Sequence, residues 1–305
     1  MTMFSVSKLK KFIMPILECI ELIKRRFVSP EKYICKIFFN RVGYPLNLEA
    51  PTTYNEKLQW LKLYWHHPML PTLVDKHAVK NFVSSQIGKQ YIIPTLGVWD
   101  SVADIDWDTL PNQFVLKCTH DSGGLVICTD KSKFNKKEAI KKLKKCLGEN
   151  YYYYGFEWPY KNVKPRIIAE TYMHDSKIDD LPDYKFFCFD GEVKALFIAT
   201  ERNRKGVEVK FDFFDADFNH LPVTQGHPNS SSTITKNDCF EEMKELASKL
   251  SKGFPQVRVD FYEIDGKIYF GEMTFFHHGG WTKFDPQEWD YTFGEWLKLP
   301  QSKIL

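Results

Sequence analysis

The segment RVDFYEIDGKIYFGEMTF, residues 258–275, reads as two strands around a tight turn and constrains the fold more than any other stretch. Side chains alternate between the two faces of a strand, so the turn decides which residues of the arms share a face. A two-residue Asp265-Gly266 turn sends Asp260 and Glu272 to opposite faces. A three-residue loop over residues 264–266 puts both acids on one face.

The three-residue loop separates polar from apolar side chains more cleanly, so we predict it, with Asp260 paired to Phe270. Two carboxylates held about 5–8 Å apart as diagonal cross-strand neighbours repel unless a cation lies between them. A hard cation such as Mg²⁺ takes few protein carboxylates and leaves room for phosphate oxygens. The alternative is an Arg258–Glu272 ion pair on a solvated sheet face. The predicted polar face carries Arg258, Asp260, Tyr262, Phe270, Glu272 and Thr274.

The stretch FVLKCTHDSGGLVIC, residues 114–128, predicts two strands joined by a loop that ends in Gly123 and Gly124. Glycine allows the backbone to approach a ligand closely, and free N–H groups in such a loop bind phosphate oxygens. Lys117, near the end of the first strand, adds a point charge to the same anion. The sequence contains neither a Walker A motif nor a Rossmann fingerprint, and an ordinary hairpin loop is the alternative.

Helical patterns dominate the first 90 residues, and strand patterns dominate the remainder. Residues 53–64 and 75–86 are predicted helices, with Asp75 as the cap of the second. Later, strands alternate with two further helices, at residues 136–147 and 241–250. This order predicts an α+β fold with helices first and an antiparallel-rich sheet later.

Composition bounds the function. The formal net charge of +3 is too small to indicate a nucleic-acid partner. The seven cysteines are never spaced C-x-x-C, which indicates a reducing compartment and argues against structural zinc.

An apolar stretch at residues 12–23 is too short to span a bilayer, but its basic flanks suit a helix that touches an anionic membrane. A helix packed on the domain is the alternative. We expect a cytoplasmic protein, with contact to the inner membrane face left open.

These features together resemble the ATP-grasp superfamily, and most closely its TupA-like branch, which is often found with genes for bacterial capsule and teichuronopeptide synthesis. The resemblance is carried by LVDKHAVKNFV, FVLKCTHDSGG, RIIAETYM, DYKFFCFDGEVKALFIATER and the acidic hairpin, between residues 73 and 276. It implies an ATP-grasp fold that holds ATP between two α+β subdomains. The expected division is a helical extension (1–50), a helical N-terminal subdomain (51–113), a small subdomain with the phosphate loop (114–172) and a large subdomain with the metal site (173–305).

The resemblance implies ATP and Mg²⁺ as cofactors. Arg202 would stabilise the transferring γ-phosphate, with Arg204 as its competitor, and Arg258 would steady an oxyanion. Thr274 stands where many members of the family have an asparagine ligand, and a hydroxyl is a poorer donor. The implied nucleotide-binding residues are Lys76, Lys117, Gly123, Gly124, Glu170, Tyr172 and Lys185. The implied metal ligands are Asp260, Glu272 and Thr274.

The implied activity is ATP-dependent ligation of a carboxylate to an amine through an acyl phosphate. The expected partners are a small molecule or glycan, such as a uronic acid or peptide of a surface polysaccharide, and the amine. In the stretch FFHHGGW, His277 and His278 are candidates for the base that activates the amine, with ordinary surface histidines as the alternative.

Three other functions remain open on sequence grounds. A metal-dependent glycosyltransferase would use the D-x-D triplet at Asp215 and Asp217, although the same residues also suit a turn. An ATP-dependent kinase on a related fold is the second alternative. A carbohydrate-binding module without catalysis is the third.

Overall fold

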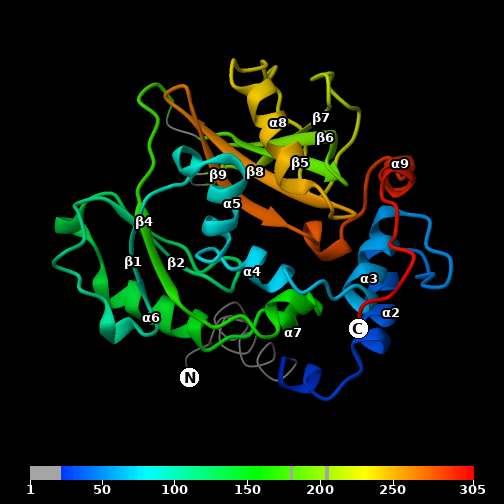
Figure 1. Ribbon diagram of the computed structural model, residues 1–305, viewed down its shortest axis with the longest axis horizontal. Coiled ribbons are helices and arrows are strands. Elements are labelled where there is room, and N and C mark those ends of the chain that lie inside the picture. The colour runs from blue at the N-terminus through cyan, green and yellow to red at the C-terminus, as the bar shows by residue number, and fades with distance from the viewer. Residues whose placement is uncertain (1–21, 179–180, 203–205) are drawn as a thin grey trace, which may run out of the picture.

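The structure is a computed structural model that describes residues 22–178, 181–202 and 206–305, and two antiparallel sheets organise it (Figure 1). The predicted apolar N-terminal helix at residues 12–23 lies almost entirely outside the described residues. The smaller sheet has the strand order β1-β4-β2-β3, with β1 Thr95–Trp99, β2 Phe114–Cys118, β3 Val126–Cys128 and β4 Ile167–Thr171. The larger sheet has the order β7-β6-β5-β8-β9, with β5 Asp183–Phe189, β6 Glu192–Thr200, β7 Lys210–Asp215, β8 Val257–Ile264 and β9 Lys267–Thr274.

Helices precede, connect and cover these sheets, so the predicted α+β class is confirmed. In the described part of the chain, no helix is both long and apolar enough to cross a membrane. The α-helices are α2 Pro30–Val42, α3 Tyr54–Tyr64, α4 Leu70–Val74, α5 Val79–Ile87, α6 Lys136–Leu147, α7 Tyr152–Gly155, α8 Phe240–Ser251 and α9 Glu288–Trp296.

Local capping explains where the first predicted helices begin. Thr53 caps α3: its hydroxyl accepts from the Glu56 N–H, and the Glu56 carboxylate accepts from the Thr53 N–H. The second predicted helix begins later than expected, at Val79. Asp75 accepts hydrogen bonds from the N–H groups of His77 and Ala78, in the turn that precedes α5. Asp75 therefore shapes the entry to α5 rather than its first turn.

The small sheet has one apolar and one polar face. Phe114, Leu116 and Cys118 are buried on the side covered by α6, and Lys117 points the other way, as the alternation of β2 predicts. Strand β1 was not predicted; it pairs with β4 and lies at the edge of the sheet. The apolar core of this sheet is a separate cluster from the larger core around the five-stranded sheet.

The large sheet is covered on both faces, but one face only in part. Phe186 of β5 meets Phe240 of α8, which covers one side. On the opposite side, Phe187 contacts Tyr54 of α3 and Phe293 of α9. Further along the same face of β5, at alternating positions, lie the polar residues Asp183 and Lys185, which line a cleft. The incomplete helical cover thus leaves a polar end of this face open towards the small sheet.

The β8–β9 hairpin closes through the two-residue turn Asp265-Gly266, so the predicted three-residue loop is wrong. Both turn residues have positive φ values, +50° and +75°, as the hairpin turn that fits the strand twist requires. Phe270 pairs with Phe261 rather than with Asp260, and it therefore leaves the predicted polar face.

A β-bulge nevertheless brings the two acids together. The register shifts between Phe261 and Asp260, with Gly271 as the extra residue of β9, and Asp260 then lies directly opposite Glu272. The prediction that both carboxylates share one face is confirmed, although they are direct and not diagonal neighbours. A side chain on Gly271 would come within 3.1 Å of the Asp260 carbonyl oxygen, so glycine suits the crowded bulge.

Candidate active site

A cleft opens where the polar face of the small sheet meets the uncovered end of the large sheet. It gathers residues that are far apart in the sequence, from the segment before α5, from β2, β4, β5 and β9, and from the glycine loop between β2 and β3. Eight predicted site residues line it: Lys76, Lys117, Gly123, Gly124, Glu170, Lys185, Arg202 and Glu272.

Four predicted residues do not line the cleft. Asp260 and Arg258 are buried beneath it, and Thr274 lies at the end of β9. Tyr172 follows the end of β4 and is half-buried, outside the cleft lining. Arg204, the competitor of Arg202, lies outside the described residues.

The small-sheet side of the cleft is built around Glu170. Its carboxylate pairs with Lys117 at 2.7 Å and also with Lys80 of α5. Burial alone would raise the pKa of Glu170, but Lys117 and Lys80 together hold it below its ordinary value. Glu170 is therefore an anion that positions two cations on the cleft wall. Sequence reasoning missed Lys80, although it lies only four residues after Lys76, in the same predicted helix.

The two glycines of the loop differ in how tightly their surroundings constrain them. Gly123 has a φ of +109°, in the region that side chains disfavour, and a β-carbon there would have no atom within 4 Å. A β-carbon on Gly124 would instead lie 2.4 Å from the Asp121 carboxylate. The Lys76 ammonium donates to the Asp121 carbonyl and so ties the loop to the chain before α5. The loop's backbone is open towards the cleft because no side chain covers Gly123.

The large-sheet side of the cleft centres on Asp183, which sequence reasoning also missed. Its carboxylate oxygen Oδ2 accepts from Lys185 at 2.7 Å and from Arg202 at 2.9 Å. Its other oxygen, Oδ1, is buried without a hydrogen-bond partner among the described residues. The available signal was position: Asp183 lies two residues before Lys185 on one strand and therefore on the same face.

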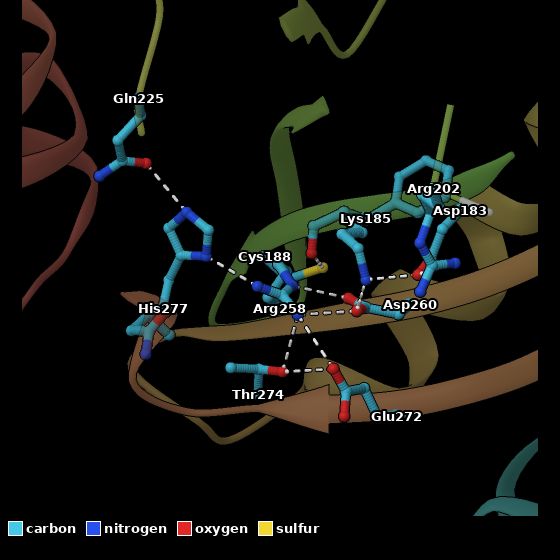
Figure 2. Close-up of polar contacts among 12 residues, drawn as sticks. Asp183, Lys185, Cys188, Arg202, Gln225, Arg258, Asp260, Glu272, Thr274 and His277 are labelled. Atoms are coloured by element: carbon cyan, nitrogen blue, oxygen red, sulfur yellow. Dashed lines mark hydrogen bonds and ion pairs between the residues drawn. The ribbon is translucent and has the colours of Figure 1, made fainter. Parts of the chain in front are cut away.

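Arg258 joins the acids of the hairpin (Figure 2). Its Nε and Nη2 donate to the two oxygens of Asp260, each at 2.7 Å, and Nη2 also reaches Glu272 at 3.2 Å and Thr274 at 3.0 Å. The alternative Arg258–Glu272 ion pair is thus present, but the arginine is only 7% exposed and the solvated face is wrong. Burial would raise the pKa of Asp260, yet Arg258 and Lys185 lower it, so Asp260 is ionised.

The carboxylates beside the cleft are of the donor type that a hard divalent cation takes, but they are not gathered within 4.8 Å of one another, and both oxygens of Asp260 accept from Arg258. Three carboxylates come from the adjacent strands β5, β8 and β9, namely those of Asp183, Asp260 and Glu272. The Glu272 side chain is 48% exposed and lines the cleft, and Asp183 keeps one buried oxygen without a protein partner in the described chain. Carboxylate oxygens are the ligands that Mg²⁺ prefers. The Thr274 hydroxyl is already engaged, because it accepts from Arg258 and donates to Glu272 at 3.4 Å.

Of the two histidines after β9, His277 is buried and His278 is partly buried, so the surface interpretation is wrong for His277, and a role as base stays a prediction. His277 is fully buried, and its ring contacts Arg258 and Gln225. Burial is the main reason that the pKa of His277 lies well below its ordinary value and that of His278 falls to about 4. Both rings are therefore neutral at physiological pH.

The D-x-D triplet forms a turn away from the cleft. The Asp215 carboxylate accepts from the N–H groups of Asp217 and Asn219 and from the Asn219 amide. Strand β7, which ends at Asp215, is the edge strand opposite β9 in the large sheet. The turn interpretation of the triplet is confirmed.

In the described part of the chain, one group of three potential metal ligands lies within 4.8 Å of one another: the thiols of Cys118 and Cys146 and the carboxylate of Asp121. Burial is the main reason that the pKa of Cys146 rises to about 11, and it raises that of Cys118 as well. Structural zinc takes four ligands. We therefore interpret the group as protonated thiols packed beneath the glycine loop.

Sequence comparison agrees with this arrangement of two sheets around a polar cleft. A sequence model of the family described as TupA-like ATPgrasp matches residues 56–298. The chain therefore belongs to the TupA-like ATP-grasp family, and it has the ATP-grasp fold that the resemblance implied. No curated protein matches the chain.

Solved structures of similar fold share little sequence with the chain. D-alanine–D-alanine ligase from Bacillus anthracis, complexed with ATP, is 17% identical with a TM-score of 0.41, covering 68% of this chain and 56% of that one. The ATP-grasp ligase PsnB, complexed with a minimal precursor, Mg and ADP, is 12% identical with a TM-score of 0.39, covering 72% and 57%. L-amino acid ligase from Bacillus licheniformis is 16% identical with a TM-score of 0.40, covering 70% and 44%. The chain thus spans about half of the length of each of these proteins.

Proposed function

We propose that the protein is an ADP-forming, ATP-dependent carboxylate–amine ligase that uses Mg²⁺. The observation that carries the proposal is the cleft itself. It joins the lysine and glycine loop of one sheet to the acidic hairpin of the other, in a chain of the TupA-like ATP-grasp family. A nucleotide in this cleft meets cations and free backbone N–H groups on one wall and carboxylates on the other.

The small-sheet wall binds the phosphates in this proposal. Lys117 supplies a point charge, and the open backbone of Gly123 and Gly124 supplies N–H donors. Both oxygens of Glu170 are paired, one with Lys117 and the other with Lys80. We therefore assign Glu170 to the positioning of these lysines, in place of the adenine contact that the resemblance implied.

The large-sheet wall handles charge during transfer. Asp260 and Glu272 would hold Mg²⁺, with Asp183 as a further oxygen donor, and the bound ion reduces the repulsion between ATP and an anionic acceptor. Arg202 and Lys185, both fixed by Asp183, face the transferring phosphoryl group. Because Arg258 is buried beneath Glu272, it acts through the acids rather than on the substrate.

The reaction proceeds in two steps. An oxygen of the acceptor carboxylate attacks the γ-phosphorus of ATP, and the bond to the β-phosphate oxygen breaks to release ADP. The neutral amine then attacks the carbonyl carbon of the acyl phosphate, and inorganic phosphate leaves with the electron pair of the broken C–O bond. The amine loses a proton, and an amide remains. Water must be excluded because acyl phosphates hydrolyse, and the glycine loop is the natural cover.

The acceptor we propose is a uronic acid or a peptide of a bacterial surface polysaccharide, joined to an amino acid or another amine. The support for this finer assignment is membership of the TupA-like family. A further part of the proposal is contact with the inner membrane face through the apolar stretch at residues 12–23 and its basic flanks; the structure describes the chain only from residue 22.

The test is an ADP-release assay with the full chain, ATP, Mg²⁺ and a panel of uronic acids and amines. The expected product has the summed mass of acid and amine minus one water, by mass spectrometry. Lys117→Met should abolish most ADP release, and Asp217→Ala, in the turn after β7, should leave it unchanged. Formation of AMP, release of a nucleoside diphosphate from a nucleotide-sugar, or a phosphorylated acceptor without amide would each contradict the proposal.

A further inference from the structure

Behind the acidic hairpin, three buried polar side chains form a row that ends at the proposed metal ligands (Figure 2). Gln225 lies between β7 and α8, and His277 follows β9. The Oε1 atom of Gln225 lies 2.9 Å from Nε2 of His277, and Nδ1 of His277 lies 2.7 Å from Nη1 of Arg258. Gln225 is 1% exposed and His277 is 0% exposed, so solvent does not supply alternative partners.

Elementary chemistry fixes the proton positions in this row. A guanidinium group only donates hydrogen bonds, so Nδ1 of His277 must accept from Arg258. A histidine ring with an unprotonated Nδ1 is neutral, and its proton sits on Nε2. That N–H donates to Oε1 of Gln225, whose amide nitrogen in turn donates to the Thr282 carbonyl at 3.2 Å. Each polar atom in the row therefore acts either as a hydrogen-bond donor or as an acceptor, and not as both.

On the side that faces His277, Arg258 is surrounded by aromatic rings and has few other hydrogen-bond acceptors. The guanidinium carbon lies 5.6 Å from the centroid of the Phe197 ring, and the rings of Phe187 and His277 are nearly perpendicular, with centroids 4.9 Å apart. In the described chain, Nη1 of Arg258 has no hydrogen-bond partner other than His277. Without this acceptor the guanidinium would have to rotate to satisfy Nη1, and rotation would move Nη2 away from Glu272 and Thr274.

The backbone holds His277 in place. It begins a 3-10 turn, His277–Gly280, in which the following three residues all have positive φ values, between +47° and +65°. The amide of Gln59 in α3 donates to the carbonyls of Gly279 and Gly280. Such a conformation persists only where its surroundings enforce it. The ring of His277 is thus presented to Arg258 by a turn that is anchored to a separate helix.

We propose that His277 is a positioning residue: a neutral imidazole, set in one tautomer by Gln225, that orients Arg258 towards Asp260, Glu272 and Thr274. It is not a general base, because Arg258 occupies its lone pair and Gln225 its proton. The catalytic consequence rests on the proposed ligase function, since it acts through the acids that hold the metal. The assignment of the hydrogen bonds themselves does not depend on the proposed ligase function.

The first test is independent of activity. Long-range ¹H–¹⁵N NMR spectra of the full chain without nucleotide should show His277 with Nδ1 unprotonated and Nε2 protonated, unchanged across the pH range in which the chain is folded. Gln225→Leu should introduce the other tautomer and shift the side-chain resonances of Arg258. An Nδ1-protonated ring in the wild type, or a ring that titrates near pH 6–7, would overturn the proposal.

The second test compares two amide replacements. The oxygen of Asn occupies nearly the position of Nδ1, whereas that of Gln extends to the position of Nε2, so His277→Asn keeps the acceptor for Arg258 and His277→Gln does not. We expect kcat for ADP release to fall about tenfold or more in His277→Gln, with KM for ATP little changed, and to recover in His277→Asn. His174→Asn, at an exposed histidine, is the control for the substitution itself.

The outcomes separate the two proposals. Equal losses in His277→Asn and His277→Gln, with both variants folded by circular dichroism, would refute the positioning role. If both variants fail to fold, the tautomer in the wild type and in Gln225→Leu decides the question. A wild-type chain that releases no ADP with any substrate would count against the ligase function, while the NMR result would still test the contact between His277 and Arg258.

Discussion

Arg258 and Asp260 form a deeply buried ion pair, and its separation should destabilise the protein strongly. Arg258→Met removes the guanidinium and leaves the carboxylate of Asp260, which is 1% exposed, with Lys185 as its remaining cation. Breaking a buried ion pair from one side costs about 3–5 kcal/mol. We expect about 3 kcal/mol, the lower end of this range, because Lys185 still neutralises part of the charge.

Replacing both partners should cost less than the two single changes combined. In Arg258→Met with Asp260→Asn, no buried carboxylate is left without its arginine, because Glu272, which also loses Arg258, is 48% exposed, and Lys185 keeps Asp183 at 2.7 Å. The expected coupling energy is about 2 kcal/mol, from urea unfolding of the wild type, both single variants and the double variant.

An exposed ion pair provides the matched control for this cycle. Lys164 and Asp100 lie 2.5 Å apart, but their side chains are 66% and 59% exposed. The coupling energy of this pair should be below about 1 kcal/mol because solvent screens both charges. A cycle at Arg258 and Asp260 that is additive, or no larger than the control, would refute the argument from burial.

Three further predictions concern other parts of the structure. Thr53→Ala removes the cap of α3 and should lower the free energy of unfolding by about 1 kcal/mol in urea, without altering ADP release. Asp183→Asn should lower it by about 3 kcal/mol and weaken nucleotide binding by isothermal titration calorimetry, because Lys185 and Arg202 lose their shared anion. Lys117 and Lys80 lower the pKa of Glu170 despite its burial. The stability that the ionised Glu170 contributes to the folded protein is therefore fully present above a pH of about 4.3, its ordinary pKa, and is lost as the pH falls through its lower pKa in the folded state. Stability measured against pH should therefore fall less steeply at acidic pH in Glu170→Gln than in the wild type; equal slopes would contradict this.

The hairpin shows how far sequence patterns reach. Alternation correctly placed Asp260 and Glu272 on one face, but it required a three-residue loop that does not exist. The actual solution is a two-residue turn combined with a bulge at Gly271. A glycine inside a strand is a recognised sign of a bulge, and it was the available signal. The two acids were still assigned to the correct face, because the burial of apolar side chains determines which residues share a face more strongly than it determines the length of the turn.

The candidate site could be predicted in its parts but not in its connections. Lys117, the glycine loop and the acidic hairpin were found because each carries a local pattern. Lys80 and Asp183 were missed because their importance depends on contacts between segments, to Glu170 and to Arg202. The same holds for His277, whose burial depends on the packing of Phe187 and Phe197 around it. One-dimensional periodicity does not contain such contacts.

The separation of the two apolar cores has a consequence for how the molecule responds to heat. Each sheet has its own cluster of buried side chains, and the polar cleft lies between them. A nucleotide that touches both walls acts as a molecular bridge, and its binding energy is available only while both halves are intact. Calorimetric scans should accordingly show two overlapping melting steps in the ligand-free chain that merge into one, at higher temperature, as the nucleotide concentration rises.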